Sequence, residues 1–290
     1  MKAIRFLSNL ILLLLTLSMP AKTMAQASNL DSILKDFYQN HDRILVASHR
    51  AAHTDYPENS LAAMREAIRI GVDIIEADVR ETKDSVLIIM HDKDINRTTT
   101  GKGLVKDLTY AELQQFYLLH NGKPTLEKIP TFEEALNIAK DKIMLDIDYK
   151  ADGERAARNT YRAIEKTKTE KQVLFFLYDY KEAVDFRKMN SKIPLMPRAY
   201  TKEDVHAILQ LGFAPIIHAD DKFYSDSLMS AIREKNIRVW SNALGKYDDM
   251  EKTTENSGFD KLLQMKQVNV IQTDRPAQLI KYLQQKKRHR

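Results

Sequence analysis

The regular alternation of short apolar segments with helical segments most constrains how this chain can fold. Apolar runs typical of strands occur at 44–48, 72–79, 143–147, 173–177, 193–196, 215–217, 237–240 and 268–271. Helical patterns separate the later runs, at about 151–168, 180–189, 201–211, 225–235 and 256–266, and a last one covers about 275–285. Eight strands alternating with helices predict a closed parallel (β/α)8 barrel of the TIM type. A doubly wound open sheet is the alternative.

Helix boundary signals support this arrangement at two places. Leu61, Met64 and Ile68 recur with helical spacing after the first strand, and Gly71 follows as a C-terminal stop. Further on, Thr131 can cap a helix, with Glu134 placed to complete a capping box.

One apolar run, at 86–90, does not fit the barrel repeat. It begins shortly after the second strand, with Asp84 and Ser85 as turn material between them. A parallel crossover needs a dozen or more residues, so these two runs should form an antiparallel hairpin. Residues 92–130 are polar and poorly periodic, and we expect them to form a small insertion in a single domain that covers 28–290.

Segment 1–27 has the layout of a secretory signal peptide. Lys2 and Arg5 precede a short apolar run, and small residues follow it. Because this run is too short to span a bilayer comfortably, the sequence predicts cleavage after Ala25 or Ala27 and export to the periplasm or the medium, with a membrane anchor as the alternative. The chain has no cysteine, which excludes disulfides and a lipid-modified cysteine.

The charge of the chain argues against a nucleic-acid partner. The formal net charge is +5, and three of the positive charges lie within the expected signal peptide, so the remainder is close to neutral. No basic stripe is interleaved with aromatic residues. We interpret the basic run 286–290 as a solvated chain end, with contact to an anionic lipid or polymer as the alternative.

Charged residues gather where the expected strands end. His49 follows the first strand, and Glu76 and Asp78 are spaced i, i+2 on the second, so that they point the same way. Two carboxylates on one face repel each other unless a cation or a proton lies between them. The spacing alone therefore favours a metal site, although a single histidine or acidic pair of this kind is often structural or solvated.

The strand at 143–147 leads into a similar pattern. Asp146, Asp148 and Lys150 share one face by the same spacing rule. Buried charges without partners are strongly disfavoured in a protein core. In a parallel barrel the active site lies at the C-terminal ends of the strands, where all of these residues fall.

Several short motifs occur in a fixed order between His49 and Pro276. They are His49-Arg50, Pro57-Glu58-Asn59-Ser60, Glu76-x-Asp78, Thr82-x-Asp84, His91-Asp92, Arg97-Thr98-Thr99, Gly101-x-Gly103, Ile129-Pro130-Thr131, Val239-Trp240 and Thr273-Asp274-Arg275-Pro276. Together they resemble the signature of the glycerophosphodiester phosphodiesterase family. The resemblance implies a barrel with an inserted segment, one divalent cation, and hydrolysis of glycerophosphodiesters to glycerol phosphate and an alcohol.

The resemblance also implies roles for single residues. His49 and His91 match the catalytic histidine pair of the family, and Glu76 and Asp78 match two of its metal ligands. The third ligand is a glutamate in the family, and Asp148 stands at that place here.

Two residues depart from the family pattern. Asp148 is one methylene shorter than glutamate, so it could bind the metal weakly or through water. Ala51 replaces the usual glycine after His-Arg, which could crowd the backbone beside the phosphate. Neither change removes a functional group.

The chemistry of the implied residues is consistent with this reaction. Three carboxylates form an all-oxygen site that suits Ca²⁺ or Mg²⁺ better than zinc. Arg50 and Lys150 can bind the phosphate. One histidine of the pair can take a proton from the nucleophile while the other gives one to the leaving alcohol. Whether the nucleophile is water or the substrate's own hydroxyl, through a cyclic phosphate, is left open.

Trp240 and four further histidines receive no assigned role. Trp240 could pack against the glycerol or belong to the barrel core. We interpret the four histidines as structural or surface residues: His53, His120, His206 and His218.

The sequence thus predicts an exported, metal-dependent phosphodiesterase that acts on a small glycerophosphodiester. Its oligomeric state and head-group preference are left open. One alternative is a lysophospholipase-D-like activity on the same scaffold, which an apolar groove beside the site would distinguish. Another is an exported ligand-binding protein with impaired catalysis, which the departures at Ala51 and Asp148 would favour.

Overall fold

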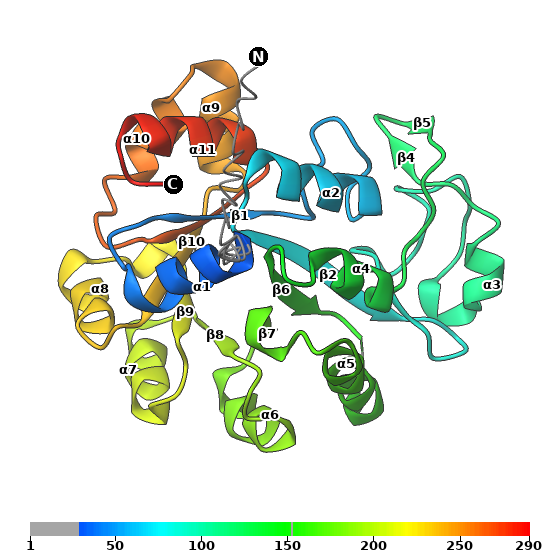
Figure 1. The fold of residues 1–290 in the computed structure, drawn as a ribbon, viewed down its shortest axis with the longest axis horizontal. Helices are drawn as coiled ribbons and strands as arrows, with labels where there is room; N and C mark the ends of the chain where they lie inside the picture. Colours follow the sequence, from blue (N-terminus) through cyan, green and yellow to red (C-terminus); the bar gives the residue numbers. More distant parts are fainter. Residues whose placement is uncertain (1–28, 152) are drawn as a thin grey trace, which may run out of the picture.

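The chain forms a closed barrel of eight parallel strands, as a computed structural model shows for residues 29–151 and 153–290 (Figure 1). The strands are β1 (Leu45–Ser48), β2 (Ile74–Glu81), β6 (Met144–Tyr149), β7 (Val173–Leu177), β8 (Leu195–Ala199), β9 (Ile216–Ala219), β10 (Arg238–Asn242) and β11 (Val270–Thr273). Strand β1 pairs in parallel with both β2 and β11, which closes the barrel. The barrel prediction is confirmed, and the open-sheet alternative is wrong. The expected signal peptide lies outside the described residues.

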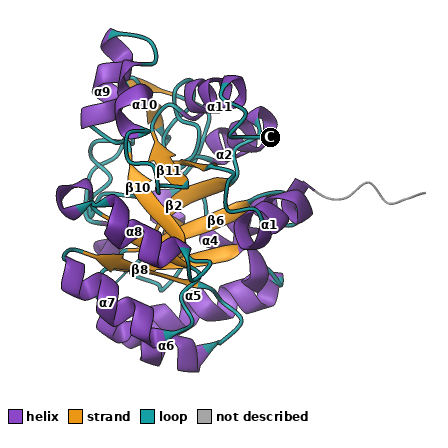
Figure 2. Cartoon of the chain, turned by 90° about the vertical axis from the view of Figure 1, so that its left-hand side faces the viewer, coloured by secondary structure: helices purple, strands orange, loops and turns teal. Residues whose placement is uncertain are grey.

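Helices cover the outside of the barrel (Figure 2). They are α2 (Leu61–Ile70), α4 (Phe132–Ala139), α5 (Gly153–Thr167), α6 (Ala183–Met189), α7 (Lys202–Leu211), α8 (Asp226–Arg233), α9 (Lys246–Thr253), α10 (Ser257–Leu262) and α11 (Pro276–Gln285). Gly71 ends α2 with a left-handed φ of 86°, and Thr131 and Glu134 form a capping box at α4. Both boundary signals read from the sequence are confirmed. No helix among the described residues has the length and apolar character needed to cross a membrane.

Most barrel strands end later than the apolar pattern indicates. Strand β6 continues to Tyr149, β10 to Asn242 and β11 to Thr273. The apolar pattern stops early because several strands end with polar side chains at the mouth of the barrel. These positions are available for the active site and do not pack in the core.

The helix expected at 256–266 is present as the shorter α10, and α9, which the sequence analysis did not anticipate, lies directly before it. The sequence of α9 is almost entirely polar and carries no apolar period. Gly258 allows α10 to lie against α9, since a Cβ atom at this glycine would lie 2.0 Å from the carbonyl oxygen of Tyr247.

The segment after β2 forms the predicted hairpin and insertion. Strand β3 (Leu87–Ile89) pairs antiparallel with β2. The insertion contains α3 (Tyr110–Leu113) and a small hairpin of β4 (Leu119–His120) and β5 (Lys123–Pro124), to the right in Figure 1. It has its own apolar cluster of Ile88, Met90, Ile95, Val105, Leu113, Leu118 and Ile129. This second cluster gives the insertion a fixed structure beside the barrel mouth.

Helix α1 (Asn29–Gln39), which the sequence analysis did not anticipate, packs at the N-terminal end of the barrel through Leu30, Ile33 and Phe37. The guanidinium of Arg238 lies beside it and donates to backbone carbonyl oxygens, including that of Phe37 at 3.0 Å. This arrangement closes the barrel on the side opposite the expected active site.

The interpretation of the basic tail as a solvated end is wrong for its last two residues. Asp73, which directly precedes β2, is fully buried and lies 2.8 Å from Nε2 of His289. It also accepts hydrogen bonds from Arg290 and from the backbone N–H of Val46, the latter at 2.8 Å. Arg290 pairs in addition with Asp36 at 3.0 Å. The buried carboxylate requires donors, and the chain end supplies them.

Candidate active site

A cavity of about 110 Å³ lies at the C-terminal ends of the barrel strands. All eight strands reach it, either with a strand residue or with the residue that follows. The lining residues are His49, Glu76, His91, Asp146, Asp148, Phe176, Tyr178, Met196, Arg198, His218, Trp240, Asn242, Leu244 and Gln272. The predicted placement of function at this end of the barrel therefore agrees with the geometry.

Three carboxylates come together beside this cavity, and two of them, Glu76 and Asp148, line it. Strands β2 and β6 are neighbours, and their register places Asp78 beside Asp148 and Glu76 beside Asp146. One oxygen atom from each of Glu76, Asp78 and Asp148 lies within 4.8 Å of the others. These are the three residues expected to bind the cation, and Asp146 lies one pair deeper along β6. Such an all-oxygen set fits Ca²⁺ or Mg²⁺.

The electrostatics of these carboxylates favour a bound cation. Burial, and then the charges of Asp78 and Asp148, raise the pKa of Glu76 well above its usual range. Burial and the same two neighbours raise the pKa of Asp146. One hydrogen bond acts in the other direction and lowers the pKa of Glu76: the backbone N–H of Arg50 donates to it at 2.8 Å. A divalent cation would relieve the repulsion between these groups.

The two residues expected to bind phosphate lie beside the carboxylates. Nζ of Lys150 is 2.7 Å from Oδ2 of Asp148 and 3.3 Å from Oδ1 of Asp78. Nε of Arg50 is 3.7 Å from Oδ2 of Asp78. The Asn59 amide donates to the same Asp78 oxygen at 2.7 Å. This contact gives a structural reason for Asn59 in the motif Pro57-Glu58-Asn59-Ser60.

His49 is held by a carboxylate from the far end of the sequence. Its Nδ1 lies 2.7 Å from Oδ1 of Asp274, and Nε2 of His53 lies 3.1 Å from the same oxygen. Although burial alone would raise it, these two contacts hold the pKa of Asp274 well below its usual range. A carboxylate at Nδ1 favours the tautomer with its hydrogen there, which leaves Nε2 of His49 able to accept a proton.

His91 has a carboxylate partner of its own. Its Nδ1 lies 2.6 Å from Oδ1 of Asp92, and Arg97 donates to Asp92 from Nε at 2.7 Å. Hydrogen bonding by Arg97 holds the pKa of Asp92 well below its usual range. Arg97 also donates to Glu58 at 2.7 Å, and Glu58 accepts from Arg50 at 3.0 Å. A chain of alternating charges thus links the insertion to Arg50.

Sequence reasoning missed the place of two histidines. His53 shares Asp274 with His49, and His218 lines the cavity, so both of these histidines lie at the candidate site. Nε2 of His218 lies 3.1 Å from Oδ1 of Asn242, which also accepts from the Trp240 indole at 3.0 Å. Burial lowers the pKa of His218 to about 4, so its ring is neutral at physiological pH. Neither histidine belongs to the motifs quoted above, so no local sequence signal predicted these contacts.

The comparisons with known proteins agree with this geometry. A model of the glycerophosphoryl diester phosphodiesterase family matches residues 49–277. A glycerophosphodiester phosphodiesterase of Caldanaerobacter subterraneus subsp. tengcongensis is 28% identical over 232 residues, which are 76% of this chain and 93% of that protein.

Solved structures show the same similarity. A glycerophosphoryl diester phosphodiesterase of Parabacteroides distasonis is 27% identical with a TM-score of 0.75, over 90% of this chain and 93% of that one. An Oleispira antarctica phosphodiesterase in complex with the product sn-glycerol-3-phosphate is 22% identical with a TM-score of 0.67, over 83% of this chain and 97% of that one. The chain belongs to the glycerophosphoryl diester phosphodiesterase family and is a phosphoric diester hydrolase.

Proposed function

We propose that this phosphodiesterase hydrolyses glycerophosphodiesters to glycerol phosphate and an alcohol with one divalent cation, Ca²⁺ or Mg²⁺. Glu76, Asp78 and Asp148 would hold the cation, and their convergence within 4.8 Å on adjacent strands is the observation that carries the proposal. When bound, such a cation offsets negative charge on the phosphate as its phosphorus is attacked. The glycerol phosphate bound to the Oleispira antarctica phosphodiesterase supports this choice of product.

His49 and His91 would perform the proton transfers. Each has its Nδ1 held by a carboxylate, at 2.7 Å for His49 and 2.6 Å for His91. One Nε2 can therefore accept the proton of the nucleophile while the other, protonated, gives its proton to the leaving alcohol. The assignment holds for either nucleophile, water or a hydroxyl of the substrate glycerol.

Arg50 and Lys150 would bind the phosphate. The guanidinium of Arg50 is fixed by Glu58 at 3.0 Å, and its remaining N–H groups can donate to phosphate oxygens. Burial by itself would lower the pKa of Lys150, but Asp148 and Asp78 raise it above its usual range, so this side chain keeps its charge. Together they place positive charge where the substrate is negative.

The test is glycerol phosphate release from glycerophosphocholine, with and without chelator and after Ca²⁺ or Mg²⁺ is added back. Asp148→Asn should raise the cation concentration needed for activity, and the matched variant Asp146→Asn should raise it much less. If Asp146→Asn abolished the cation dependence while Asp148→Asn left it unchanged, the proposed ligand on β6 would be wrong.

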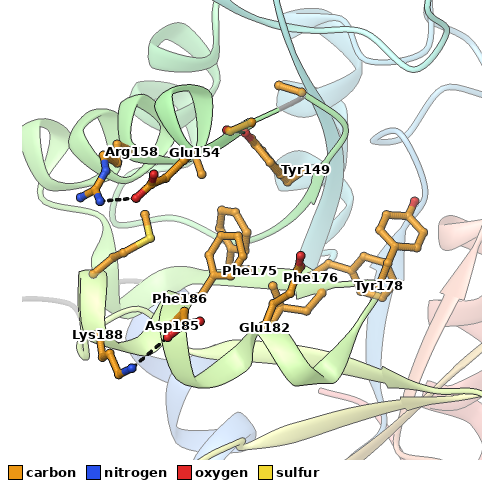
Figure 3. Close-up of a pocket in the computed structure, with 15 residues that line it drawn as sticks. Tyr149, Glu154, Arg158, Phe175, Phe176, Tyr178, Glu182, Asp185, Phe186 and Lys188 are labelled. Carbon is orange, nitrogen blue, oxygen red and sulfur yellow. Dashed lines mark hydrogen bonds and ion pairs between the residues drawn. The ribbon is translucent and has the colours of Figure 1, made fainter.

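A large pocket beside the site favours the lysophospholipase-D-like alternative as a second candidate function. It has a volume of about 750 Å³ and lies between α5 and α6. Figure 3 shows its aromatic residues, among them Phe175 and Phe186, whose ring centroids lie 5.1 Å apart. Phe176 and Tyr178 line both this pocket and the smaller cavity with the carboxylates. An acyl chain attached to the substrate glycerol would find apolar surface here.

Choline release from lysophosphatidylcholine and from glycerophosphocholine would test this candidate. Phe186→Ala enlarges the pocket but leaves every residue of the carboxylate cavity in place. If the pocket holds an acyl chain, this variant raises the KM for the lysophospholipid alone. Equal changes in KM for both substrates, or no choline release from the lysophospholipid, would contradict the lysophospholipase-D-like activity.

We further propose that the protein is exported after cleavage near Ala25 or Ala27. The support is the order of basic, apolar and small residues in segment 1–27. Amino-terminal sequencing of the protein from culture medium or periplasm should find a start near Gln26 or Ser28. An intact Met1 in the membrane fraction would indicate an anchor.

A further inference from the structure

Tyr178 lines both the large pocket between α5 and α6 and the smaller cavity with the carboxylates. It follows β7, the strand beside β6, and the residue is 44% exposed. The ring meets that of Phe176 edge-on, with centroids 4.8 Å apart, and Figure 3 shows it pointing away from Phe175. Its hydroxyl therefore does not enter the aromatic part of the large pocket.

The hydroxyl instead contacts the carboxylate of Asp148. It lies 2.9 Å from Oδ1 and 3.0 Å from Oδ2, so its single hydrogen is shared between the two oxygens. Lys150 donates to the same hydroxyl at 3.1 Å. Among the described residues, Tyr178 is the one hydrogen-bond donor to Oδ1 of Asp148.

Lys150 alone cannot fix this carboxylate in the same way. Its Nζ lies 2.7 Å from Oδ2 of Asp148 but also 3.3 Å from Asp78 on the neighbouring strand. An ammonium group is a compact charge without a preferred plane, so it does not set the rotation of the carboxylate. The Tyr178 hydroxyl touches both oxygens and does.

We propose that Tyr178 is a positioning residue that holds Asp148 in the orientation the cation requires. The inference rests on the proposed function, in which Asp148 is a ligand. Hydrogen bonds to a ligating carboxylate orient it and tune its affinity for the metal. The aspartate side chain is short, so its carboxylate has little reach, and the Tyr178 contact holds it in one orientation.

The test measures cation binding directly, by isothermal titration calorimetry of the metal-free full chain with Ca²⁺ and then Mg²⁺. Tyr178→Phe keeps the ring and its contact with Phe176 but removes the hydroxyl, and should raise Kd about tenfold. Tyr149→Phe is the matched control, because it removes a hydroxyl that lines the same large pocket and donates to the carbonyl oxygen of Gly153 at 3.1 Å. Its Kd should not change.

The same substitution in an Asp148→Glu variant shows whether Tyr178 acts by positioning Asp148 or by a general effect on the cation site. In Asp148→Glu the longer side chain needs less support, so adding Tyr178→Phe should change Kd by less than about threefold. An equal loss in both backgrounds, or no loss in the Asp148 background, would overturn the inference.

Asp148→Asn distinguishes this inference from the proposed function. If it abolishes Ca²⁺ binding while Tyr178→Phe has no effect, the inference fails and the ligand assignment stands. If Ca²⁺ binding survives Asp148→Asn unchanged, the ligand assignment itself is wrong.

Discussion

The two ends of the barrel bury carboxylates in opposite electrostatic environments. At the N-terminal end, Asp73 is fully buried, yet contacts with His289 and Arg290 hold its pKa below the usual range despite that burial. At the C-terminal end, burial and neighbouring carboxylates raise the pKa of Glu76. Both residues belong to the same short stretch of chain, because Asp73 directly precedes β2 and Glu76 lies within it.

The difference separates a carboxylate that stabilises the fold from carboxylates that lower its stability. Asp73 has a donor for each oxygen, so its charge is compensated inside the protein. The cluster around Glu76 has too few donors and gains most from a cation. Excess charge retained at a functional site at the expense of stability is a common compromise in enzymes. Substitutions at the two ends should therefore have opposite consequences.

The largest effect should come from the histidines at the functional end. His49→Ala and His91→Ala should each lower kcat by on the order of 10²–10⁴, because each removes a proton-transfer group. Neither is proposed as a ligand, so calorimetry should show unchanged Ca²⁺ affinity. Turnover close to that of the unsubstituted enzyme in either variant would refute the acid–base assignment.

At the opposite end, Asp73→Asn should affect stability and leave the chemistry intact. It removes the buried carboxylate that pairs with Arg290 and contacts Nε2 of His289, and Asp36 compensates Arg290 only in part. The free energy of unfolding should fall by about 3 kcal/mol. Urea unfolding measures the loss, and kcat per folded molecule should not change. A stable variant with impaired turnover would mean that the two ends are not separate.

The sign of the pH dependence should also differ between the ends. The raised pKa of Glu76 means that the folded, chelator-treated protein holds this proton more tightly than the unfolded chain, so stability falls as pH rises above the usual value of 4.5. The lowered pKa of Asp73 gives stability that is present above its usual value of 3.8 and is lost as pH falls further.

Glu76→Gln isolates the first of these contributions. It should raise the metal-free free energy of unfolding by about 1 kcal/mol at pH 7, reduce its decline between pH 5 and 8, and weaken Ca²⁺ binding. Urea titrations at several pH values in chelator measure both stability effects. A variant less stable than the parent at pH 7 would argue against repulsion in the cluster.

The smallest effect concerns the loop after β1. Ala51 has a left-handed φ of 65° and is buried, so Ala51→Gly relieves backbone strain while increasing the freedom of the unfolded chain. We expect a net gain of about 0.5 kcal/mol, seen as a small rise in Tm. Ala52→Gly is the control, because Ala52 is buried without a positive φ, and it should lower Tm. Equal shifts in both variants would exclude strain at Ala51.

Local sequence patterns were sufficient to find the barrel and the chemical groups of the site. The i, i+2 spacing of Glu76 and Asp78 fixes their common face, and the apolar run before His49 places that histidine at a strand end. Both signals depend on residues close together in the chain.

The partners of these groups could not be predicted in the same way. The contacts of His49 with Asp274 and of Glu58 with Arg97 join residues from different elements, and no local period encodes which carboxylate meets which base. Helix α9 was missed for a related reason, since its polar sequence is stabilised by its neighbours and not by an apolar face of its own. Tertiary packing decides such cases.

The seam between β1 and β11 has a consequence for how the enzyme folds. Asp274 follows β11 and orients His49 across a sequence separation of 225 residues, whereas the proposed ligands lie on the adjacent strands β2 and β6. Contacts between distant segments close slowly, because the loop entropy must be overcome before they form. A refolding molecule should therefore recover its affinity for Ca²⁺ before it recovers turnover. The return of activity would report the moment at which the first and last strands meet.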